Sequence, residues 1–152
     1  MERRVLIHAP RGRDAQVIQH VIENLGLQAQ ACTSHQELLA RLEEGAAAAI
    51  LTQEALLELP DDLMRSWLTA QPSWSDFPFV VLATRVASSA RAMNALQRLG
   101  NSIVLERPVR TETLARAVDA AVRQRRRQYA TRSHLDQLEQ ARAEVERLNG
   151  QL

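Results

Sequence analysis

The chain has 152 residues, which is enough for one domain with a buried core and an appendage. Its formal net charge is +1, so global charge gives no reason to expect a nucleic-acid partner, and the absence of lysine excludes any mechanism that needs a lysine amine. The single Cys32 excludes an intrachain disulfide and is typical of a reducing compartment. No apolar run approaches the roughly 18 residues of a membrane span, and the amino terminus does not resemble a signal peptide. We therefore expect a cytoplasmic protein without a membrane span.

The amino-terminal segment predicts a strand, a helix and a second strand. Residues 5–8 are a short apolar run that indicates a buried strand. Asp14 is expected to cap a helix that Gly26 stops, and residues 28–33 follow as a second strand. The apolar face of this helix is expected to consist of Val17, Ile18, Val21, Ile22 and Leu25.

The next segment predicts a helix and a central strand. Ser34 and Glu37 form a capping box that starts the helix, and Gly45 ends it. Residues 46–52 are small and apolar, as expected for a strand that is buried on both faces. The pattern of residues 53–59 is ambiguous.

Two further helices and two further strands follow. A helix is expected to open at Pro60, and residues 77–84 are the clearest strand of the chain. Ser88 or Ser89 is expected to cap the next helix, and residues 102–105 form the fifth strand. Strands that alternate with helices of about 10 to 13 residues predict a parallel sheet with helices on both faces. In such sheets the functional crevice lies beyond the carboxyl ends of the strands.

Three motifs at those strand ends carry a family resemblance. Residues 5–7 lead into Ala9-Pro10, residues 79–84 end on the hydroxyl of Thr84, and residues 105–109 contain Arg107-Pro108. With these motifs and their spacing, about three-quarters of the chain resembles the receiver domain of two-component signalling. The resemblance implies a flavodoxin-like α/β fold, doubly wound, with a five-stranded parallel sheet of order 2-1-3-4-5.

The same resemblance implies that the phosphorylation chemistry has been lost. Receivers carry two acids after the first strand, an acceptor Asp after the third strand and a Lys after the fifth. Here these positions are Ala9, Pro10, Thr52 and Arg107. Mg²⁺ needs hard oxygen ligands, usually including carboxylates, and Thr is a poor nucleophile without an activating base. We name this set the vestigial receiver site: Ala9, Pro10, Thr52, Thr84, Arg107 and Pro108. The resemblance thus implies a pseudo-receiver with no catalytic residue, no cofactor and no metal.

Three other interpretations of this site are open. The vestigial pocket could bind an anion through Arg11, Arg13 and Arg107, which would make the domain an anion or small-ligand sensor. The simpler interpretation is that these are solvated loop arginines, with Arg107 paired to Glu54 or another nearby acid. A third hypothesis is phosphotransfer to an atypical residue such as Thr52.

The carboxyl-terminal segment predicts one long helix. No Gly or Pro occurs between Thr111, its expected cap, and Gly150, and a continuous helix of that length would extend about 60 Å. Its second half has apolar residues at alternating spacings of four and three, which is typical of a coiled coil. We name these residues the seam: His134, Leu138, Ala141, Val145, Leu148 and Leu152. The seam predicts a parallel homodimer, with residues 1–122 as the receiver-like domain and residues 123–152 as a helical linker and coiled-coil extension.

A basic stretch joins the two halves of this helix: Arg123, Arg125, Arg126, Arg127 and Arg132. A basic run before heptads is also typical of basic-zipper DNA readers, but the base-reading Asn is missing, so a solvated linker face without nucleic acid is expected. The chain stops in mid-heptad, which is typical of a fragment. The expected function is therefore a non-phosphorylatable signalling module that acts by protein contact, for example on a downstream histidine kinase transmitter.

Overall fold

The structure is a computed structural model that describes residues 2–10, 13–83 and 90–150. Strands and helices alternate along the chain as the sequence predicted, with residues 53–59 forming a short helix, α3. In chain order the elements are β1 (Val5–His8), α1 (Asp14–Asn24), β2 (Ala29–Ala31), α2 (His35–Glu44), β3 (Ala48–Thr52), α3 (Gln53–Glu58), α4 (Asp61–Thr69), β4 (Phe79–Ala83), α5 (Ala90–Leu99), β5 (Ser102–Glu106) and α6 (Thr111–Gly150).

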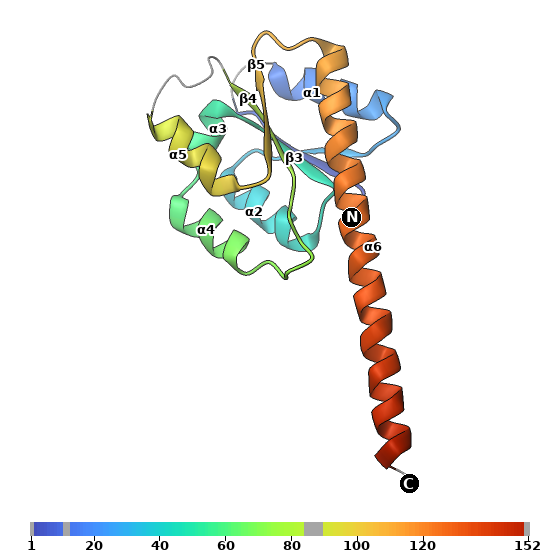
Figure 1. Ribbon diagram of the computed structural model, residues 1–152. Coiled ribbons are helices and arrows are strands. Elements are labelled where there is room, and N and C mark those ends of the chain that lie inside the picture. The colour runs from blue at the N-terminus through green and yellow to red at the C-terminus, as the bar shows by residue number, and fades with distance from the viewer. Residues whose placement is uncertain (1, 11–12, 84–89, 151–152) are drawn as a thin grey trace.

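The five strands form one parallel sheet of order β2-β1-β3-β4-β5, which confirms the predicted topology. In Figure 1 the sheet lies between two layers of helices. Helices α1 and α6 cover one face, and α2, α3, α4 and α5 cover the other.

The core divides into two parts because successive strand residues point to opposite faces. In β1, for example, Val5 and Ile7 pack under α1 and α6, whereas Leu6 packs under α2. The central strands β3 and β4 alternate in the same way, and every residue of both is buried. A parallel sheet covered on both faces requires such continuous apolar strands.

Most of the predicted helix ends are confirmed. The hydroxyl of Ser34 accepts a hydrogen bond from the Glu37 amide at 3.2 Å, and the Glu37 carboxylate in turn accepts one from the Thr33 amide at 3.0 Å. Gly26 and Gly45 follow α1 and α2 with φ angles of +79° and +109°, a backbone conformation that residues with a side chain rarely adopt.

The predictions from the sequence were wrong for the start of two helices and for one residue on a helix face. Arg13, not Asp14, is the cap residue of α1, and the Leu114 amide bonds the Arg110 carbonyl, so Thr111 lies inside α6 rather than capping it. Val17 was expected in the core but is 57% exposed. The second strand is also shorter than residues 28–33 and comprises Ala29–Ala31.

The last helix is continuous for 40 residues, as the sequence predicted. Its first half packs on the sheet, and Figure 1 shows its second half continuing well beyond the domain. Across the described ranges of the chain, no helix is both long enough and apolar enough to cross a membrane.

Candidate functional site: the carboxyl edge of the sheet and the long helix

The residues of the vestigial receiver site that the structure describes lie together at the carboxyl edge of the sheet. Ala9 and Pro10 follow β1, Thr52 ends β3, and Arg107 and Pro108 follow β5. The Arg107 amide donates a hydrogen bond to the Ala83 carbonyl at the end of β4, which continues the β4–β5 pairing by one residue. Thr84 and Arg11 lie outside the described residues.

Thr52 has a structural role at this edge. Its side chain is 2% exposed, and its hydroxyl accepts a hydrogen bond from the Ala55 amide at 3.2 Å, which caps α3. A hydroxyl in this position satisfies one of the free amides at the start of a helix. The residue at the acceptor position is therefore engaged with backbone, and the neighbouring Ala9 offers no side-chain oxygen.

Arg107 is held between two carboxylates. Its Nη2 atom lies 3.1 Å from Asp14 Oδ2 and 3.5 Å from Glu54 Oε2. Both contacts are at ion-pair distance without hydrogen-bond alignment, since Nη2 has no hydrogen-bond partner. One positive charge thus faces two negative charges, and the pairing of Arg107 with Glu54 is confirmed. Arg13, the third predicted anion contact, is exposed at the start of α1.

These acids do not form a metal site in the described part of the chain. No group of three or more His, Cys, Asp or Glu side chains is placed there to hold a metal ion. Asp14 and Glu54 are separated by the guanidinium of Arg107, which occupies the position that a cation would need.

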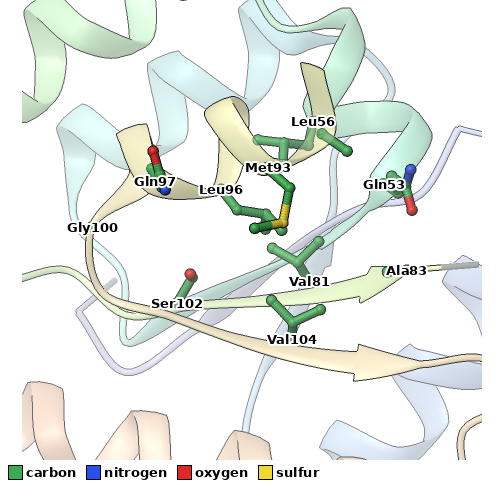
Figure 2. Close-up of a pocket in the computed structure, with 11 residues that line it drawn as sticks. Gln53, Leu56, Val81, Ala83, Met93, Leu96, Gln97, Gly100, Ser102 and Val104 are labelled. Carbon is green, nitrogen blue, oxygen red and sulfur yellow. The ribbon is translucent and has the colours of Figure 1, made fainter. Parts of the chain in front are cut away.

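An apolar cavity of about 360 Å³ lies beside this edge, beneath α5. In Figure 2, Met93 and Leu96 of α5 point toward Val81 of β4 and Val104 of β5 across this space. Gln53, which follows Thr52, lines one end of the cavity. The described residues therefore leave part of the apolar space between α5 and the sheet unfilled.

At the opposite end of the domain, a group of side chains that we name the junction cluster ties α6 to the domain: Glu2, Trp74, Phe77, Arg125, Tyr129 and Arg132. The guanidinium of Arg125 lies 4.5 to 5.3 Å from the ring centroids of Tyr129, Phe77 and Trp74. Arg132 binds both carboxylate oxygens of Glu2, at 2.6 and 2.8 Å, and the Tyr129 hydroxyl donates to the Ala46 carbonyl at 2.9 Å. Hydrogen bonding to Arg132 lowers the pKa of Glu2.

The junction cluster corrects the expectation that the basic stretch is a solvated linker. Arg125 is only 4% exposed, and Arg132 is half-buried. Arg123, Arg126 and Arg127 are exposed as expected. The contacts of α6 with the domain therefore continue past residue 122 to Arg132. The sequence contained one relevant signal, because Arg125, Tyr129 and Arg132 have the spacing of a single helix face.

The seam is exposed in the single chain. Leu138, Val145 and Leu148 are 54%, 56% and 49% exposed, and His134 and Ala141 are also exposed. Leu152 lies outside the described residues.

The seam and the junction cluster occupy opposite faces of α6. Arg125, Tyr129 and Arg132 each precede a seam residue (His134, Leu138 and Ala141) by nine positions. Nine residues are about two and a half turns at 3.6 residues per turn, which places each pair half a turn apart. A helix packed on the seam would therefore lie on the side of α6 that faces away from its own domain.

Comparison with solved structures identifies the fold. The receiver-domain protein (CheY-like) of Methanospirillum hungatei JF-1 superposes with a TM-score of 0.64 at 14% identity, covering 84% of this chain and 98% of that chain. A sensor protein from Polaromonas sp. JS666 superposes with a TM-score of 0.62 at 22% identity, covering 82% of this chain and 99% of that chain. Full-length FixJ from B. japonicum superposes with a TM-score of 0.63 at 17% identity, covering 82% of this chain and 60% of that chain.

These likenesses show that the chain has the fold of the response-regulator receiver domains. No family model matches the sequence, and no curated protein matches it. At such low identity the fold is shared without showing a shared activity. The function must therefore be argued from the residues of this chain.

Proposed function

We propose that this chain is a receiver-like signalling module of a two-component system that accepts no phosphoryl group and transmits its signal by protein contact. The observation that carries the proposal is the state of the vestigial receiver site. The acceptor position is Thr52, whose hydroxyl caps α3, and Ala9 and Pro10 follow the first strand, β1. The site therefore lacks the carboxylates that receivers carry at these positions, which are the usual ligands for Mg²⁺ and the acceptor for the phosphoryl group. The chain then has no catalytic activity of its own.

The test is to add beryllofluoride, a mimic of the phosphoryl group, with Mg²⁺ and to record amide NMR spectra. We expect no shifts at Thr52 or Ala9. A variant with Ala9→Asp, Pro10→Asp and Thr52→Asp, which restores three carboxylates, serves as the positive control. Saturable shifts around Thr52 in the unaltered chain would contradict the proposal and favour phosphotransfer to this threonine.

The second part of the proposal is a parallel homodimer formed by the seam. Its apolar side chains are exposed along the part of α6 that extends beyond the domain. Such a stripe buries apolar surface only against a partner, and a second copy of the same stripe is complementary to it. Because the seam faces away from the domain, two helices could pair with the two domains on the outside. Sedimentation velocity over a wide concentration range measures this directly, and a monomer at all concentrations would contradict it.

In the proposed mechanism, a protein partner shifts the packing of α5 and α6 and thereby alters the helix pair. The cavity beneath α5 supports this step, because Met93 and Leu96 line free space into which they can repack when the helix moves. The junction cluster would carry the change to the coiled coil, since it connects α6 to the amino-terminal ends of the strands. A cytoplasmic histidine kinase transmitter that follows the coiled coil would receive the change in helix angle or register.

A further inference from the structure

A second cavity, of about 910 Å³, opens between α6 and the amino-terminal edge of the sheet. It lies at the opposite edge from the vestigial receiver site. Its apolar surface comes from Leu27, Ala47 and Val122. A volume of this size is within the range of small-molecule sites, which combine apolar surface with a few polar groups.

Three arginines line this cavity, and none of them is in an ion pair with an acid among the described residues. Arg3 and Arg126 are exposed, whereas Arg125 is only 4% exposed. Within residues 2–10, 13–83 and 90–150, none of the three is in an ion pair. The carboxylate of Glu2 also lines the cavity, but both of its oxygens are bound by Arg132.

Arg125 is the unusual member of this group. Its Nη1 atom donates to two neutral acceptors, Ser75 Oγ and Gln128 Oε1, each at 2.7 Å. Its Nε atom is buried and has no hydrogen-bond partner among the described residues. The Glu2 carboxylate is near enough for the charge of Arg125 to lower its pKa, but Glu2 accepts its hydrogen bonds from Arg132. A buried cation without a hydrogen-bonded counter-charge is unfavourable, and the aromatic contacts of the junction cluster offset only part of that free energy. An anionic ligand would add negative charge beside Arg125.

We propose that this cavity binds a small anionic metabolite whose phosphate or carboxylate group is held by Arg3, Arg125 and Arg126. The planar fork of arginine matches both kinds of oxyanion. The remainder of the molecule would lie on the apolar surface of Leu27 and Val122. In contrast, Arg107 at the vestigial site already faces two carboxylates, which disfavours an anion there.

The bound anion would also connect the long helix to the sheet. The cavity is lined by α6 residues and by Ala47, which directly precedes β3. An occupied cavity would therefore hold α6 more firmly where it leaves the domain, independently of whether two copies pair through the seam.

The experiment is thermal unfolding in sodium pyrophosphate or citrate, at fixed protein concentration, against sodium chloride of equal ionic strength. We expect a saturable rise in Tm of about 4 °C for the class of anion that fits, which distinguishes phosphate from carboxylate ligands. Arg3→Gln and Arg126→Gln should each remove most of this rise. Arg127→Gln is the matched control, because this exposed arginine on the same helix does not line the cavity.

Two outcomes would overturn the proposal. One is the absence of any rise in Tm beyond that in sodium chloride for both anions. The other is an equal loss of the rise in Arg126→Gln and Arg127→Gln, which would indicate diffuse counterion binding. Sedimentation velocity on the same samples reports the oligomeric state separately, so failure of this proposal is distinct from failure of the dimer.

Discussion

Cys32 is the only thiol of the chain, and its environment makes it unreactive. Burial and, to a smaller extent, the nearby Glu37 carboxylate raise the pKa of the Cys32 thiol from 9.0 to about 11. Since the thiolate is the reactive form, a rise of about two pKa units lowers the reactive fraction about 100-fold. We expect Ellman's reagent at pH 8 to label the native protein at least about 100-fold more slowly than the urea-unfolded chain. Equal labelling rates would show that Cys32 is accessible in the native state.

Arg125 is expected to contribute to stability through packing more than through charge. Arg125→Ala leaves a void beside Trp74 and Tyr129 and removes the cation–π contacts, so we expect a loss of about 2 to 4 kcal/mol in the free energy of unfolding. Arg125→Met keeps apolar contact with the rings and removes a buried charge, so its loss should be less than half as large. Urea unfolding measures both values.

The control for Arg125 is its exposed neighbour on the same helix. Arg127→Ala should change the free energy of unfolding by no more than about 0.5 kcal/mol, as is usual for surface positions. If Arg125→Ala changed the free energy of unfolding as little as Arg127→Ala, the junction cluster would not stabilise the attachment of α6 to the domain.

At the scale of elements, the two halves of α6 have different roles. The first half is part of the domain core, and the second half has an apolar seam with no partner in the single chain. Leu138→Asp or Val145→Asp places a charge at the centre of the proposed helix pair, where it would lose hydration. We therefore expect each variant to sediment as a folded monomer with an unchanged circular dichroism spectrum of the domain.

Ala143→Asp is the matched control for this prediction. Ala143 is exposed on the face opposite the seam, so the same charge is added without touching the helix pair. The variant should remain dimeric. If Val145→Asp also stays dimeric, the interface lies elsewhere and the coiled-coil interpretation is wrong.

For the whole molecule, the orientation of the two copies can be tested with an introduced thiol. In a parallel, in-register pair the two copies of residue 148 face each other at the interface, whereas in an antiparallel pair they do not. In a Cys32→Ser background, we expect Leu148→Cys to form an intermolecular disulfide rapidly under mild oxidation, observed by non-reducing electrophoresis. Ala143→Cys should cross-link slowly, and equal rates for the two variants would contradict the parallel arrangement.

The sequence alone determined the order of elements and the continuous last helix, and its resemblance to receiver domains implied the order of the strands in the sheet. The first two rest on local patterns: alternating apolar runs, the capping box at Ser34, and the absence of Gly and Pro before Gly150. The position of the vestigial receiver site was also readable, because strand ends converge at one edge of a parallel sheet whatever their side chains are. Ala9 and Thr52 could therefore be placed before any contact was known.

Only the tertiary structure decided how the charged residues are used. Asp14 has the chemistry of a helix cap, but it faces Arg107, which lies more than 90 positions away in the sequence. Arg125 belongs to a basic run that suggests solvent exposure, but rings from the loop before β4 bury it. Local patterns determine which backbone structure forms, whereas the pairing of a charge depends on the residues that distant segments bring to it. For this reason the vestigial site was visible in the sequence, and the junction cluster and the basic cavity were not.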